Sequence, residues 1–93
     1  MAIFNQISVR IIKEQELIIG PLAWEEAKKV PGLQVVDQQK GEVAFGADAK
    51  DVLDKLVAQY GRLFGRASIE VCKEAVQDLI ADLPKEQVPA SLQ

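Results

Sequence analysis

The stretch formed by residues 18–33, IIGPLAWEEAKKVPGL, decides how the chain is divided into elements. Gly20-Pro21 and Pro31-Gly32 interrupt it near its two ends, and the chain's only tryptophan, Trp24, lies between these breaks. Proline suits the first turn of a helix, and glycine is common just after the last turn. The stretch therefore predicts a short helix over residues 22–30, with its glutamates first and its lysines last, as the helix dipole favours.

The segment before the first break, residues 3–19, is rich in isoleucine and allows two interpretations. At 100° per residue, one face gathers five apolar side chains, which is typical of an amphipathic helix: Ile3, Phe4, Ile7, Ile11 and Ile18. Residues 7–11 also alternate between apolar and polar, and β-branched residues favour strands. The helical pattern covers more of the segment, so we expect a helix over residues 3–19, with a strand as the alternative.

The segment after the second break, LQVVDQQKGEVAFG, predicts a β-hairpin. Two short β-rich runs, residues 33–37 and 42–45, flank the polar turn QQKG. Gly41 can adopt the positive φ that such turns need. Because an isolated hairpin is only marginally stable, we expect it to pack on the helices or to pair with a second copy.

The C-terminal half predicts two amphipathic helices. Asp48 suits the N-cap of the first helix, which runs to about residue 64, where Gly65 stops it. The second covers about residues 67–83 and ends at Pro84. We expect residues 85–93 to form a flexible tail. The sequence thus predicts one small α+β domain over residues 1–93, mainly helical, with two helices, a hairpin and two further helices.

Composition excludes several classes of protein. The 93 residues are 48% apolar and carry a net charge of −3, which argues against binding to nucleic acid, where affinity comes largely from basic residues. No apolar run reaches the length that spans a membrane. The N-terminus has no basic leader or long apolar block, as a signal peptide would. With Cys72 as its single cysteine, the chain is expected to be a soluble cytoplasmic protein.

The residue types needed for common catalytic chemistry are missing. The chain has no histidine, which removes histidine-based nucleophilic sites and most zinc and haem sites. Cys72 falls on an apolar helix face, so we expect a buried thiol, with a reactive or dimer-bridging thiol as the alternative. We assign no catalytic, cofactor-binding or metal-ligating residue, and expect the chain not to be an enzyme.

The remaining signal is an excess of apolar side chains over residues 3–24, more than one small core needs. It predicts a non-enzymatic interaction or assembly module whose partner is a second copy or another protein. The candidate interface residues are Phe4, Ile12, Ile19 and Trp24. For Trp24, packing in the chain's own core is the first interpretation, ahead of an interface with a partner and of stacking on a ligand. The alternative function is a regulatory domain that senses a small ligand in a pocket between hairpin and helices; an enzyme ranks last.

The stretch KVPGLQVVDQQKGEVAFG, followed by an amphipathic helix, resembles the opening of roadblock-type dimerisation domains. Those domains also run from a helix through a turn into a hairpin and another helix. The resemblance implies dimerisation and covers about a quarter of the chain. The later strands of that fold are replaced here by the helix predicted over residues 67–83, and no site residue is carried over.

Overall fold

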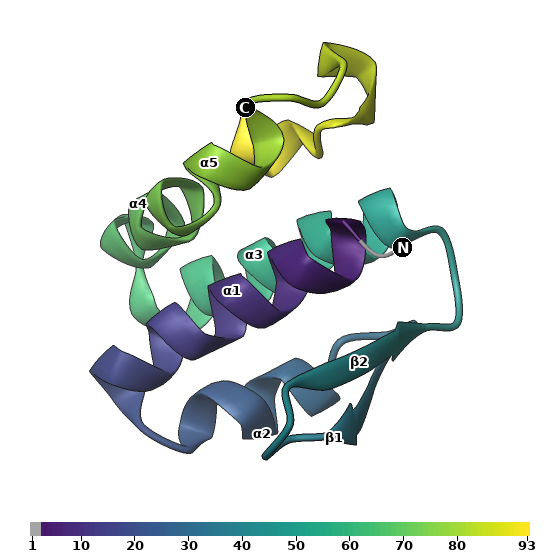
Figure 1. Ribbon diagram of the computed structural model, residues 1–93. Coiled ribbons are helices and arrows are strands. Elements are labelled where there is room, and N and C mark those ends of the chain that lie inside the picture. The colour runs from purple at the N-terminus through teal and green to yellow at the C-terminus, as the bar shows by residue number, and fades with distance from the viewer. Residues whose placement is uncertain (1–2) are drawn as a thin grey trace.

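The computed structural model describes residues 3–93 and shows a mainly helical α+β domain. The segment with two interpretations is a helix. The elements are α1 (Ile3–Ile19), α2 (Leu22–Lys28), β1 (Leu33–Asp37), β2 (Glu42–Phe45), α3 (Ala49–Phe64), α4 (Arg66–Ala75), α5 (Gln77–Ile80) and two 3₁₀ turns, η1 (Lys85–Gln87) and η2 (Ala90–Leu92). In Figure 1, α1 crosses the middle of the molecule, with α4 and α5 on one side and α2 and the hairpin on the other.

The core forms where α1, α2 and α3 meet, because each turns an aliphatic stripe toward the others. Trp24 and Tyr60 are its largest fully buried side chains. The Tyr60 hydroxyl donates a hydrogen bond of 2.6 Å to the backbone carbonyl of Ala23, which ties α3 to α2. Burial raises the pKa of the Tyr60 hydroxyl, because the phenolate would lose its hydration. Tyr60 thus lies on the buried face of α3, which is an amphipathic helix as predicted.

The hairpin is antiparallel, with Leu33 opposite Phe45, Val35 opposite Val43, and a bulge at Val36. Its base is held close to α3 by Gly32, which has a φ of +85°. A Cβ at this position would lie 2.8 Å from Cγ2 of Val52, so only glycine fits without displacement. The Pro31-Gly32 break therefore ends α2 and also lets the hairpin approach α3.

The GRLFG sequence, residues 61–65, covers the last turn of α3 and the single residue before α4, and its two glycines serve different purposes. Gly65 has a φ of +91° and ends α3. At Gly61, a Cβ would lie 2.7 Å from Cδ1 of Ile69 on α4. Gly61 thus permits close packing of the two helices.

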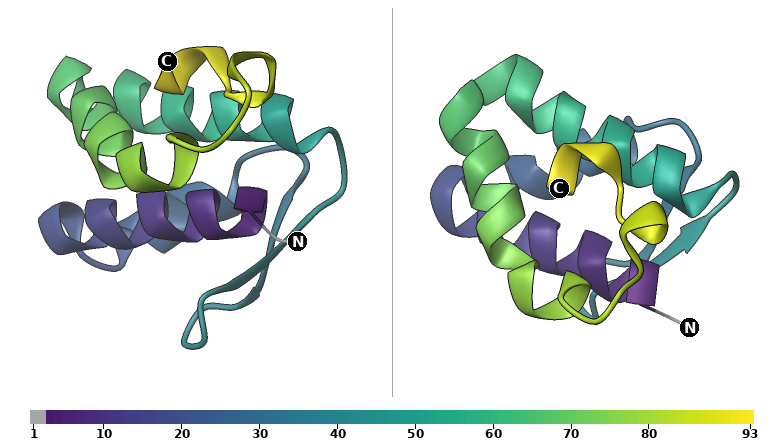
Figure 2. Two further views of the ribbon diagram at one scale, coloured as in Figure 1. Left: turned by 45° about the horizontal axis from the view of Figure 1, so that its top comes forward. Right: turned by 90° about the horizontal axis from the view of Figure 1, so that it is seen from above.

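The C-terminal segment differs from the prediction in two respects. The expected single helix is divided at Val76, which has φ −117° and ψ 8°. The tail is docked rather than flexible: Figure 2 shows it lying along α3 and α4. Val88 and Leu92 are buried, and Asp54 accepts hydrogen bonds from the backbone N–H (3.1 Å) and the hydroxyl (2.6 Å) of Ser91.

Asp48 stands at the N-cap of α3, as the sequence predicts, but its side chain makes no capping hydrogen bond. The carboxylate lies exposed to solvent. The first turn of α3 is therefore stabilised by packing more than by this cap.

Candidate functional site

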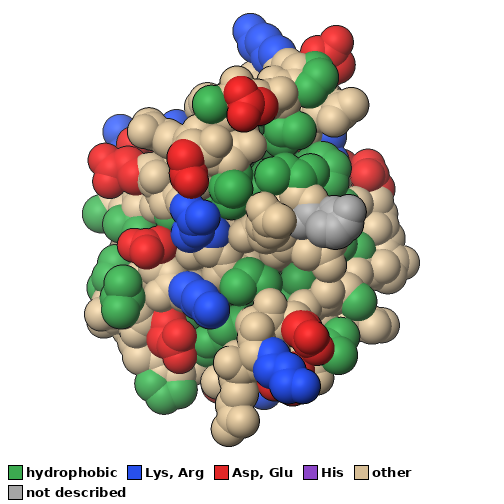
Figure 3. All heavy atoms as spheres, viewed as in Figure 1, with side chains coloured by type: hydrophobic (Ala, Val, Ile, Leu, Met, Phe, Trp, Pro, Cys, Tyr) green, Lys and Arg blue, Asp and Glu red, His purple; other side chains and the backbone are tan. Residues whose placement is uncertain are grey.

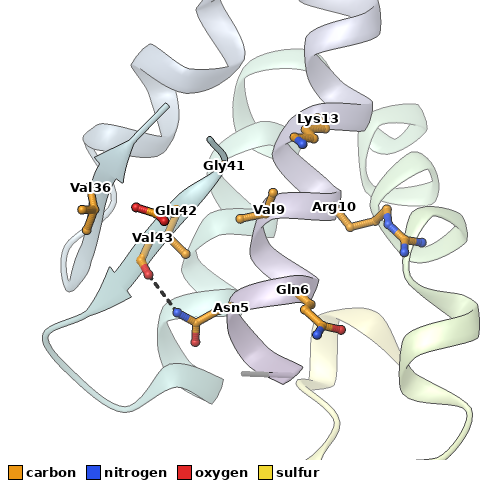
Figure 4. A pocket seen from close by; sticks show the side chains of 9 residues that line it. All are labelled: Asn5, Gln6, Val9, Arg10, Lys13, Val36, Gly41, Glu42 and Val43. Carbon is orange, nitrogen blue, oxygen red and sulfur yellow. Dashed lines mark hydrogen bonds between the residues drawn. The ribbon is translucent and has the colours of Figure 1, made fainter. Parts of the chain in front are cut away.

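Two hollow surfaces flank α1, and the first lies between α1 and the hairpin (Figure 4). It is an open groove of about 790 Å³. Asn5 of α1 closes one end of it by donating a hydrogen bond of 2.8 Å to the backbone carbonyl of Val43 on β2. Gly41 holds the turn close to α1, since a Cβ there would lie 3.2 Å from Cγ1 of Val9. The sequence predicted a hollow between hairpin and helices, and this groove occupies that position.

The polar side chains around this groove do not converge on one point. Figure 4 shows Arg10 directed away from the hairpin. Its guanidinium forms an ion pair of 3.1 Å with Asp78 and donates a hydrogen bond of 3.0 Å to the backbone carbonyl of Ala75. Lys13 and Glu42 are exposed at the rim. A specific ligand site usually has a few polar groups aimed at one ligand, and this groove lacks that arrangement.

The second hollow surface lies between the C-terminal half of α1 and α4. We call it the α1–α4 patch and define it by its four apolar side chains: Leu17, Ile18, Phe64 and Val71. Leu17 is 80% exposed and Ile18 is 62% exposed. In Figure 3, the left side, where α4 and the C-terminal end of α1 lie in Figure 1, shows hydrophobic side chains among acidic ones. Large aliphatic side chains exposed together in this way mark interaction sites more often than isolated ones do.

The stripe of α1 explains why Ile18 is exposed. Ile7, Ile11 and Ile18 lie on one face of the helix at 100° per residue, and Ile7 and Ile11 are fully buried. A helix of 17 residues is about 25 Å long. The aliphatic face of α1 therefore continues past the part of the helix that the core covers.

Between α1 and the start of α4, the patch contains a small socket of about 120 Å³. Its walls are mainly apolar, from Ile18, Phe64, Ala67 and Val71, and its polar lining comes from Gln15 and Ser68. Gln15 donates a hydrogen bond of 3.0 Å to the backbone carbonyl of Ser68 and accepts one of 2.9 Å from the Ser68 hydroxyl. The buried polar groups beside the socket therefore satisfy one another.

Cys72 belongs to the same network and is fully buried, as the sequence predicts. Its Sγ accepts a hydrogen bond of 3.4 Å from Gln15 Nε2. Burial raises the pKa of the thiol from 9.0 to about 11, because the thiolate would lose its hydration. In this conformation the thiol is inaccessible, which opposes a reactive or bridging role.

The raised pKa of Cys72 predicts a loss of stability in alkali. Below pH 9 the thiol is protonated in both folded and unfolded chains, so its contribution to the free energy of unfolding is fully present. This contribution is lost as the pH rises from 9 toward 11. Between pH 9 and 10, Cys72 is expected to remove at most roughly 1.4 kcal/mol per pH unit from the free energy of unfolding, and above pH 10 Tyr60 adds a further loss. Urea titrations at pH 8 to 11 measure this loss. In Cys72→Ala, the loss of stability should begin nearer pH 10, where the Tyr60 hydroxyl ionises in the unfolded chain. An unchanged profile of stability against pH would contradict the assignment of the loss to Cys72.

The structure separates the four predicted interface residues into two pairs. Ile12 (0% exposed) and Trp24 (1% exposed) lie inside the chain's own core, so in this conformation neither can contact a second chain. The burial of Ile12 corrects its assignment to an interface, whereas the burial of Trp24 agrees with the core packing that the sequence favours for it. Phe4 and Ile19 are half-buried and pack on the edge of the core. Of the four, only Ile19 lies beside the α1–α4 patch, where it lines the socket.

Sequence reasoning missed Leu17 as an interface residue, and it also missed the exposure of Leu63 and Phe64. Both side chains are partly exposed where α3 ends at the surface. Leu17 lies off the main stripe of α1, and that position was the available signal: a large aliphatic side chain on an otherwise polar face.

One carboxylate is an exception to the usual exposure of acidic side chains. Glu26 is buried and accepts hydrogen bonds from Gln59 (2.7 Å) and Lys29 (3.1 Å). The hydrogen bond from Gln59, followed by that from Lys29, lowers the pKa of Glu26. A carboxylate that is held ionised by two partners links α2 to α3 and is poorly suited to proton transfer near neutral pH.

Within residues 3–93, no group of three or more potential ligand side chains is placed to hold a metal ion. No helix in this part of the chain is both long and apolar enough to cross a membrane. No protein-family model matches the chain, and no similar curated protein or solved structure was found. The fold and its surfaces therefore define the class, a mainly helical α+β domain with an exposed apolar patch.

Proposed function

We propose that this chain is a non-enzymatic interaction module that self-associates through the α1–α4 patch. The observation that supports this proposal is the exposure of Leu17 and Ile18, side by side on a helix whose aliphatic face runs beyond the core. Removing such a side chain from water stabilises an association by about 1.5–3 kcal/mol. The buried, protonated Cys72 fits a reducing compartment, and we include a cytoplasmic location in the proposal.

The sequence pointed to the same helix but to different residues on it. Ile12 faces the core, whereas Leu17 and Ile18 face solvent. An interface built on Leu17 and Ile18 needs no unfolding of the domain. Two copies could therefore associate as folded units, which is the common case for preorganised interfaces.

Replacing either Leu17 or Ile18 with glutamate is expected to dissociate the oligomer, because each change places a charge in a surface that must lose water. Sedimentation velocity should show the wild-type chain above its monomer mass at about 100 µM, within the range of weak complexes, and both variants as monomers. Circular dichroism should show unchanged helix content.

Gln6→Glu is the matched control, since it adds the same charge at an exposed position of α1 outside the patch. It should keep the wild-type mass. A wild-type chain that stays monomeric throughout the concentration range would refute self-association.

The second candidate function is binding of a small ligand in the groove between α1 and the hairpin, and its volume of about 790 Å³ is the observation in its favour. A fragment screen by NMR tests it. Fragments that shift the amide signals of Val9, Val43 and neighbouring residues would support this function. A screen without such shifts would remove it.

A further inference from the structure

The C-terminal segment packs on the domain as a bound peptide packs in a groove. We call residues 84–93 the C-terminal strap. Figure 2 shows it beside α3 and α4, and both helices contact η2. The side chains of Val88, Pro89 and Leu92 are buried, whereas most other residues of the strap are exposed. Binding through a few buried anchors is how grooves hold peptide segments.

The hydrogen bonds of the strap are nearly all internal to it. The backbone N–H groups of Gln87, Val88, Leu92 and Gln93 donate to carbonyls within residues 84–93. The side-chain amide of Gln93 donates to two further carbonyls of the strap. Among residues 3–93, no hydrogen bond between backbone groups joins the strap to the rest of the chain. The strap can therefore leave as one unit without breaking a helix or a strand.

Two polar contacts fasten the strap to α3. Asp54 accepts hydrogen bonds from the backbone N–H (3.1 Å) and the hydroxyl (2.6 Å) of Ser91. Lys50 donates a hydrogen bond to the backbone carbonyl of Glu86. Hydrogen bonds to a charged group are stronger than neutral ones, so the contact between Ser91 and Asp54 is the main polar bond that holds the strap closed.

An open hollow of about 490 Å³ lies between the strap and the helices α4 and α5. Four apolar side chains line most of it: Ile80, Leu83, Val88 and Leu92. Figure 1 shows the chain looping away from α5 before it returns toward the helices. Because two of the buried anchors border this hollow, an incoming segment can reach them before the strap has left.

We call the face beneath the strap the α3–α4 groove, with Lys50 and Asp54 on its α3 side and Lys73 on its α4 side. The strap itself shows which sequence this groove accepts. Residues 88–92 read VPASL, an apolar residue followed by proline, any residue, serine and leucine. The first, second and fifth positions are buried, the third is exposed, and the serine bonds to Asp54.

We propose that the α3–α4 groove is a peptide-binding site, that the C-terminal strap occupies it in the free chain, and that opening of the strap admits a partner segment with the pattern of residues 88–92. In this arrangement the strap is autoinhibitory, because the apparent affinity for the partner is reduced by the fraction of molecules that are open. The groove shares no residue with the α1–α4 patch, so this proposal is independent of the proposed self-association.

Native-state hydrogen exchange followed by NMR tests whether the strap opens by itself. The amides of Val88 and Leu92 should have similar protection factors, because the strap opens as one unit. These factors should be at least about a hundredfold lower than those of Leu56 and Val57 in α3, which exchange only when the helical body unfolds. Strap amides that are protected as strongly as those of α3 would overturn the proposal.

A charge at position 91 tests the contact that holds the strap closed. Ser91→Asp places a second carboxylate against Asp54, and exchange of the strap amides should become about tenfold faster or more, with unchanged helix content. Combining it with Asp54→Lys pairs opposite charges and should restore the protection. Gln87→Glu adds the same charge at an exposed position of the strap and should leave the exchange rates unchanged.

A synthetic peptide of residues 85–93 tests the groove itself. In the full-length variant Ser91→Asp with Leu92→Ser, the strap has lost its main polar bond and one anchor, so the groove should be open. The peptide, added at about 1 mM to allow for weak binding, should shift the amide signals of Asp54 and Lys73. A peptide with alanine in place of Leu92 is the matched control and should shift neither signal.

The outcomes of the peptide experiment each decide one part of the proposal. Shifts at Asp54 and Lys73 in the open variant, and weaker ones in the wild-type chain, support a groove that the strap blocks. A folded, open variant whose signals do not respond to the peptide overturns peptide binding. A variant that loses its helix content overturns the strap as a detachable segment, because the helical body then depends on it.

Discussion

Replacing Ile12 with glutamate is expected to unfold the protein at neutral pH. The Ile12 side chain is 0% exposed and lies between helices of the core. An ionised carboxylate there would lose its hydration without a partner, and a change of this kind costs about 4–5 kcal/mol or more. A 93-residue domain has a total stability of about 5–14 kcal/mol. Circular dichroism at 222 nm should show a large loss of helix, and urea titration should show little or no folded baseline.

The control for this prediction is Ile18→Glu on the same helix. Ile18 is the same residue type with the same helical neighbourhood, but its side chain is mostly exposed. We expect Ile18→Glu to retain the folded baseline and to differ in mass alone. An Ile12→Glu variant that folds and merely becomes monomeric would mean that Ile12 faces a second chain, as the sequence first indicated.

Local signals in the sequence were sufficient for most element boundaries. Both strands begin and end where the polar turn and the flanking glycines predict, and α1 covers the whole of residues 3–19. The choice between helix and strand for residues 7–11 was settled by the longer pattern, since the helical stripe also includes Phe4 and Ile18. Propensity alone would have favoured a strand there.

Contacts between distant segments account for the errors. The division between α4 and α5 has no glycine or proline to signal it. There the backbone carbonyl of Ala75 accepts a hydrogen bond from Arg10 of α1, and the Leu79 N–H bonds to Val76 instead. The docking of the tail likewise depends on Asp54, which is 37 residues away from Ser91. Such partners cannot be read from periodicity.

The candidate interface illustrates the same limit. A hydrophobic stripe shows which side chains share a face, but the length of the neighbouring helices decides which part of that face is covered. On α1, neighbouring elements bury Ile11 and Ile12 but leave Ile18 mostly exposed. The excess of apolar residues was therefore visible in the sequence, whereas its location required the packing of α3 and α4.

Trp24 shows how the broken stretch at residues 18–33 stabilises the fold. Trp24 is 1% exposed, in a short helix held between Gly20-Pro21 and Pro31-Gly32. A helix of seven residues is not stable by itself, so its position depends on what it buries. Alongside Trp24, α2 buries Ala23 and Ala27, whose side chains are small. Most of the apolar area that fixes α2 therefore comes from Trp24.

Replacing Trp24 with alanine is accordingly expected to lower the free energy of unfolding by about 3–5 kcal/mol, since the cavity cannot be refilled by small neighbours. Urea titration followed by circular dichroism measures the loss, and Trp24→Phe should lose less because it leaves a smaller cavity. In the wild-type chain, the tryptophan emission maximum should be that of a buried indole and should not change on dilution from dimer to monomer. An emission maximum that moves to longer wavelength on dilution would place Trp24 in the contact between copies instead of in its own core.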